Sequence, residues 1–122
     1  MKTLQQQHRD TVQALSSDAY DVGTYDADTL QPVEFSEGYQ VTFYQVGARW
    51  SDAVYVWLVE FFQDMGDGRT YLGKFEGTPE ISFKIRDRRT ALQLARDYNQ
   101  ISVWDWANGC EIATGGTGIA VA

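Results

Sequence analysis

Apolar and polar positions alternate most clearly between residues 80 and 98. Ile81, Phe83 and Ile85 stand between polar side chains, and this period of two predicts a strand with one buried face. From residue 87 the apolar positions recur at intervals of three and four, which predicts a helix over 87–98 with Asp87 as its N-cap. The chain is therefore expected to pass directly from a strand into a helix here.

Two further strands and a tight turn are predicted after this helix. The stretch 100–106 alternates again, and Asn108-Gly109 is a residue pair preferred in two-residue type I′ hairpin turns. We expect residues 110–113 to run back along the preceding strand.

The middle of the chain predicts a strand, a helix and another strand. Residues 39–46 alternate, residues 51–65 carry the most regular helical spacing in the protein, and residues 70–76 alternate again. The stretch Gly66-Asp67-Gly68 is expected to end the helix, because glycine tolerates the left-handed conformation of a helix cap. We interpret Trp57 as a core residue of this helix rather than as part of a ligand-stacking site.

Together these elements predict an α+β fold in a single domain, residues 1–122. The order strand, helix, strand, strand, helix, strand over 39–106 is the split βαβ order of ferredoxin-like folds. We therefore expect an antiparallel-rich sheet, extended by the C-terminal hairpin strand and preceded by an N-terminal extension.

Both ends of the chain give weaker patterns. Residues 1–17 predict a loosely docked N-terminal helix with His8 on the surface, and residues 114–122 predict a mobile, Gly-rich tail. Short strands are expected at 22–25 and 33–35, separated by an Asp-rich turn.

Acidic residues are concentrated in the first third of the chain. The protein has seventeen acidic and ten basic residues, a net charge of −7, yet no Lys or Arg lies between residues 10 and 48. The acidic residues of that interval are Asp10, Asp18, Asp21, Asp26, Asp28, Glu34 and Glu37. Direct binding of nucleic acid by this region is disfavoured, because phosphate groups would repel it.

Three interpretations of these acids stay open. They form a solvated surface that aids solubility, they face a basic protein partner, or they pair internally with cations of the second strand–helix unit. The internal candidates are Lys84, Arg86, Arg88, Arg89 and Arg96. As the partner-facing set we name Asp18, Asp21, Asp26, Asp28, Glu34 and Glu37.

No motif predicts a catalytic centre, a metal site or a cofactor. Asp26 and Asp28 lack the later ligands of a calcium loop, and the Gly-rich stretch 114–118 is not followed by a helix that could bind phosphate. Cys110 is the only cysteine, and we expect it to be structural or incidental. A single thiol is typical of the reducing cytoplasm. Since the sequence also has no apolar run long enough to span a membrane, we expect a soluble cytoplasmic protein.

Trp104 and Trp106 are the remaining candidate site. Two residues apart on a strand, they are expected on one face of the sheet. Either N-terminal apolar residues cover them, or they form an exposed contact surface, since Trp is enriched in binding anchors. The expected covering residues are Tyr20, Tyr25, Leu30 and Phe35.

A resemblance adds a biological context. The segment 71–83, followed by 91–95 and 98–102, resembles small accessory proteins carried by bacteriophages and mobile elements. The resemblance assigns no role to individual residues. It implies that the chain is an inhibitor of host defence, such as an anti-CRISPR protein that imitates nucleic acid.

The leading hypothesis is therefore a non-enzymatic, acidic protein-binding module that occupies the nucleic-acid-binding cleft of a basic host protein. Two other hypotheses stay open: a small enzyme or ligand-binding domain that uses the face of Trp104 and Trp106, and a structural component that associates with copies of itself.

Overall fold

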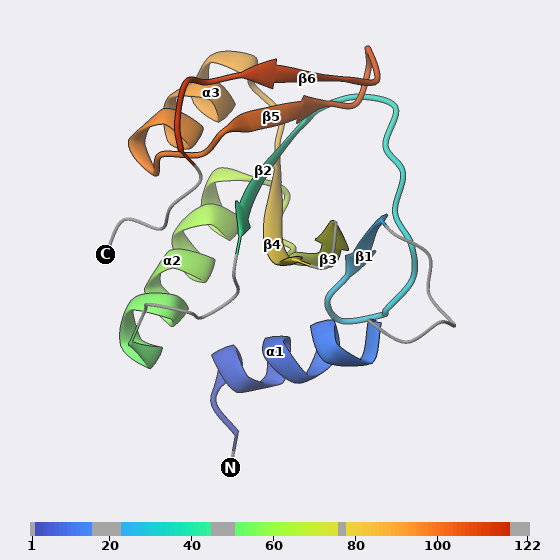
Figure 1. The fold of residues 1–122 in the computed structure, drawn as a ribbon, viewed down its shortest axis with the longest axis vertical. Coiled ribbons are helices and arrows are strands. Elements are labelled where there is room, and N and C mark those ends of the chain that lie inside the picture. The colour runs from blue at the N-terminus through green and yellow to red at the C-terminus, as the bar shows by residue number, and fades with distance from the viewer. Residues whose placement is uncertain (1, 16–22, 45–50, 76–77, 118–122) are drawn as a thin grey trace.

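The computed structural model describes residues 2–15, 23–44, 51–75 and 78–117 (Figure 1). These residues form three helices and six strands. The elements are α1 (Leu4–Leu15), β1 (Gly23–Asp26), β2 (Tyr39–Tyr44), α2 (Asp52–Met65), β3 (Tyr71–Phe75), β4 (Thr78–Ile85), α3 (Arg88–Asp97), β5 (Ser102–Asp105) and β6 (Cys110–Ala113).

The six strands form one sheet in the order β1-β3-β4-β2-β5-β6. All its paired strands are antiparallel. The sheet and helices confirm the mixed α+β prediction. Strand β4 lies between β2 and β3, and β2 lies between β4 and β5, so each of the two helical crossovers, through α2 and through α3, passes over one intervening strand.

A single core lies between the helices and one face of the sheet. Alternate strand residues point into it, as shown by Val41, which faces Phe83 on one neighbouring strand and Val103 on the other. Helix α2 contributes the fully buried Phe62, and α1 contributes Val12. Figure 1 shows α2 and α3 on one side of the strands, with the long connection from β1 to β2 on the other.

Local hydrogen bonds explain where the two long crossover helices begin. The Ser51 side chain accepts a hydrogen bond from the amide of Val54, and the Asp87 carboxylate accepts one from the amide of Thr90. Each satisfies an amide that would otherwise lack a partner in the first helical turn. The predicted helices at 51–65 and 87–98 are thus confirmed.

Two local predictions were wrong. Residues 33–35 form no strand, although Pro32 forms an isolated bridge with Tyr25 and the amide of Val33 donates to the carbonyl of Thr24. The hairpin between β5 and β6 has four loop residues, because Asp105 pairs with Cys110, and Gly109 has a positive φ whereas Asn108 does not.

The predicted end of α2 at Gly66-Asp67-Gly68 is confirmed. The left-handed glycine of this stretch is Gly68, at a φ of 80°, whereas Gly66 has a φ of −114°. The amides of both glycines donate to the carbonyl of Gln63.

None of the helices in the described ranges combines the length and hydrophobicity needed to cross a bilayer.

Candidate functional site

Of the four predicted acidic residues that the structure describes, three lie in the connection between β1 and β2. We call residues 27–38 the acidic loop. Its three carboxylate residues, Asp28, Glu34 and Glu37, are exposed. Asp18 and Asp21, also predicted for this face, lie outside the described residues.

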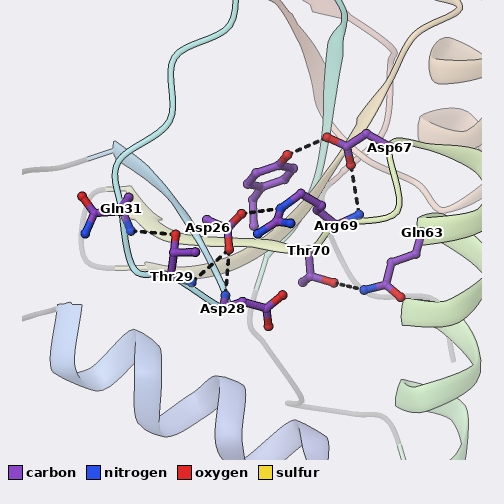
Figure 2. A network of polar contacts seen from close by, with 9 residues as sticks. Asp26, Asp28, Thr29, Gln31, Gln63, Asp67, Arg69 and Thr70 are labelled. Carbon is purple, nitrogen blue, oxygen red and sulfur yellow. Dashed lines mark hydrogen bonds and ion pairs between the residues drawn. The ribbon is translucent and has the colours of Figure 1, made fainter.

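Asp26 behaves differently from the other acids, because its carboxylate is used inside the protein. The residue is 6% exposed, and one carboxylate oxygen accepts a hydrogen bond of 2.6 Å from Nε of Arg69. The other oxygen accepts the backbone amides of Asp28 and Thr29 at 2.8 and 3.1 Å (Figure 2). Asp26 therefore anchors the start of the acidic loop and is not available as a partner-facing charge.

The hydrogen bond from Arg69 is the main reason that the pKa of Asp26 falls from 3.8 to about 2. The two backbone amides act in the same direction, since they also favour the ionised form. Arg69 was not among the five cations expected to pair with the N-terminal acids. It follows α2, 43 residues after Asp26, and no sequence pattern linked the two positions.

The anchor continues into the turn between α2 and β3. Asp67 accepts the backbone amide of Arg69 at 3.1 Å and the hydroxyl of Tyr71 at 2.5 Å. Burial and this hydrogen bond raise the pKa of Tyr71. The neighbouring residue Thr70 accepts a hydrogen bond from the side chain of Gln63 through its hydroxyl. Its backbone carbonyl accepts a second one from the amide of Ala27. Figure 2 shows these groups meeting between β1, α2 and β3.

The carboxylates of this network accept hydrogen bonds from its own members. Each oxygen of Asp26 already accepts at least one donor, and Asp67 accepts one on each oxygen. Such an arrangement fixes the relative positions of the acidic loop and the α2–β3 turn. Within the described ranges, no three His, Cys, Asp or Glu side chains are grouped so that they could hold a metal ion.

The second predicted site, around Trp104 and Trp106, lies on the sheet face opposite the core. The two indole rings meet edge to face with centroids 6.2 Å apart, and both residues are half-buried. The indole nitrogen of Trp106 donates to Gln40 at 3.1 Å, and Gln40 in turn donates to Ser82 at 2.9 Å. Trp106 itself follows the end of β5 and starts the hairpin loop.

Phe35 of the acidic loop covers part of this face. Its ring meets Trp106 edge to face at 5.4 Å and Tyr71 at 5.5 Å, while the ammonium of Lys84 lies 4.2 Å from its ring centroid. The prediction that N-terminal apolar residues pack there is confirmed for Phe35. It was wrong for Tyr25, which belongs to the helix-side core, and Tyr20 lies outside the described residues.

Helix α2 presents an apolar surface that the sequence reasoning assigned to the core. Trp57 is 56% exposed, and its ring stacks on that of Phe61 at 5.3 Å with an angle of 10° between the planes. The prediction that Trp57 is a core residue was therefore wrong. The apolar pattern of α2 is wider than the core can cover, and Tyr55 and Val59 take up the buried side.

His8 was also misassigned, since it is buried rather than on the surface. Its Nδ1 lies 2.6 Å from the hydroxyl of Tyr55, which joins α1 to α2. Burial lowers the pKa of His8, with Asp28 acting in the opposite direction, and burial raises the pKa of Tyr55. The pair therefore fixes the docking of α1 most firmly when His8 is neutral.

Cys110 is exposed at the start of β6, directly after the hairpin loop.

Comparisons with known protein families, curated proteins and solved structures found no match for this chain.

Proposed function

We propose that this chain is a non-enzymatic protein-binding module that uses its acidic loop to bind a basic partner. The observation that carries the proposal is the loop itself, in which Asp28, Glu34 and Glu37 are all exposed and no Lys or Arg intervenes. The sign of this surface favours a cationic partner, because complementary charge steers association and suppresses wrong partners.

The anchored geometry of the loop adds support. Asp26 holds its first residues and Phe35 packs on the opposite sheet face near its end. A loop that is already ordered loses less conformational entropy when it binds, so its charges are presented at a smaller cost in affinity.

A narrower identity is also part of the proposal. We infer a bacteriophage-borne inhibitor that acts in the host cytoplasm and occupies a nucleic-acid-binding cleft, with the loop carboxylates taking the place of phosphates. The resemblance of residues 71–83 to accessory proteins of mobile elements motivates this identity. A ferredoxin-like arrangement of residues 39–106 is proposed with it, supported by the interleaved order of β3, β4, β2 and β5.

The experiment compares two triple variants that remove the same number of negative charges. The test variant combines Asp28→Asn, Glu34→Gln and Glu37→Gln, and the control removes three exposed acids elsewhere. The control substitutions are Asp10→Asn, Asp97→Asn and Glu111→Gln. A partner captured from bacterial lysate is purified, and its association rate with each variant is measured over a salt series.

The test variant should associate more slowly and with a shallower salt dependence than the control, because it lacks the charges that steer the partner. Salt weakens this steering in the wild type, since the screening length is about 8 Å at physiological ionic strength. Displacement of the chain by nucleic acid would support the cleft-binding identity. Equal rates and equal salt slopes for the two variants would show that the acidic loop does not mediate binding.

A further inference from the structure

Helix α2 carries a row of apolar side chains that stay partly exposed among the residues that the structure describes. Val54, Trp57 and Met65 are 46%, 56% and 43% exposed, and Phe61 is partly buried between them. Their spacing of three and four residues places them along one side of the helix. We call these four residues the exposed stripe.

The stripe has features of a binding surface rather than of scattered exposed residues. Trp57 and Phe61 stack with nearly parallel rings, so their apolar surfaces form one continuous cluster. Large exposed aromatic side chains that lie together are typical of binding anchors, because burying them removes much apolar area from water. Between Val54 and Met65 the helix rises about 16 Å, which matches roughly three turns of a second helix.

Charge indicates what kind of partner fits. Glu60 lies three residues after Trp57 and Asp64 three after Phe61, so each exposed carboxylate borders a ring of the stripe. Asp52 is the only other charged residue of α2, which contains no Lys or Arg. A second copy that paired its own α2 with this one would bring like charges together, and an anionic lipid surface would be repelled.

We propose that the exposed stripe binds a basic amphipathic helix of another protein. Its apolar side chains would lie on Trp57 and Phe61, and its Lys or Arg residues would reach Glu60 and Asp64. This is the mode in which an amphipathic helix lays its apolar face on a hydrophobic surface. The inference rests on α2 alone and does not require the acidic loop to bind anything.

The test uses the full chain and a synthetic peptide of leucine and lysine in which leucine recurs at helical spacing. A scrambled peptide of the same composition is the matched probe. Binding is measured by calorimetry, and the helicity of the bound peptide by circular dichroism. We expect the patterned peptide to bind and become helical, and the scrambled peptide to bind at least tenfold more weakly.

Variants then locate the site. Trp57→Ala should weaken binding of the patterned peptide at least tenfold, as for other aromatic anchors. Ile101→Ala should leave it unchanged, although Ile101 is also 47% exposed. Val54→Lys provides a second variant at an exposed position in case Trp57→Ala alters folding. The pair Glu60→Gln and Asp64→Asn should reduce both the affinity and its salt dependence.

The other outcomes overturn the proposal. Equal binding of the two peptides, or equal binding by Trp57→Ala, would show that the stripe is not the site. Concentration-dependent self-association that Trp57→Ala abolishes, without peptide binding, would assign the stripe to a second copy. Binding to anionic vesicles in place of the peptide would assign it to a membrane surface. If the triple variant of the acidic loop lost peptide binding while Trp57→Ala kept it, the peptide would bind at the acidic loop and not at the stripe.

Discussion

The substitution Asp26→Asn separates the internal role of one carboxylate from the external role of its neighbours. Asparagine keeps an oxygen that can accept the amides of Asp28 and Thr29, but it loses the negative charge that pairs with Arg69. We therefore expect the turn to persist and only the ion pair to be lost. Asp26→Ala, in contrast, removes the ion pair and the turn acceptor together.

The expected magnitude follows from the pKa of Asp26. A fall from 3.8 to about 2 corresponds to an upper limit of roughly 2–3 kcal/mol in the free energy of unfolding. The Arg69 side chain is 45% exposed, so water screens the pair and we expect about 1 kcal/mol for Asp26→Asn. For a chain of this size that is a fall in Tm of roughly 3–6 °C. Asp26→Ala should cost about 1–2 kcal/mol more.

The assay is thermal and urea unfolding, followed by circular dichroism, between pH 7 and pH 2. Because the folded pKa of Asp26 lies below the unfolded value, its contribution is complete above about pH 4 and is lost as the pH falls toward 2. The difference between the wild type and Asp26→Asn should shrink over the same interval. Glu37→Gln, which removes an exposed charge from the acidic loop, is the matched control. A wild-type Tm for Asp26→Asn, or an equal fall for Glu37→Gln, would refute the reasoning.

Four further substitutions test other parts of the structure. Tyr55→Phe leaves His8 buried without this hydroxyl and should destabilise the fold by about 1–2 kcal/mol in urea titrations. The folded pKa of His8 lies below 6.5, so the wild type should lose stability as the pH falls below about 6.5, whereas His8→Phe should lose less. Gly73→Ala would bring a Cβ onto the carbonyl of Gly23 and should increase hydrogen exchange in β1, while an unchanged β1 would contradict this packing. Cys110→Ser should change Tm by less than about 2 °C, because the residue is exposed, and loss of partner binding with intact folding would disprove an incidental role.

Much of the fold could be predicted because its signals are local. The period of two in β4 and the N-cap of α3 at Asp87 depend on residues a few positions apart, and both were placed correctly. The order of elements also followed from these local patterns. What they could not supply was the exact hairpin loop after β5, where pairing between Asp105 and Cys110 decides the loop length.

The candidate sites were less predictable, because they depend on contacts between distant residues. Arg69 reaches Asp26 across 43 positions, and His8 meets Tyr55 across 47. Helix α2 shows a different limit, since its apolar arc is wider than one core-facing side. Periodicity placed Trp57 on the same stripe as Leu58 and Phe62, yet only the packing of α1 and the sheet determines which part of the arc is covered.

Because of this packing, one acidic residue is used inside the structure while others stay exposed. An unpaired acidic segment of this length would repel itself and stay extended, which disfavours an ordered binding loop. At the start of the acidic loop, Asp26 stabilises an ordered backbone by accepting hydrogen bonds from three donors. In the later part of the loop, Phe35 packs on Trp106 at the sheet. One carboxylate is thus used to order the connection on which the exposed Glu34 and Glu37 stand. The acidic loop and the exposed stripe of α2 are made of different residues, and we propose that each binds a cationic partner on its own.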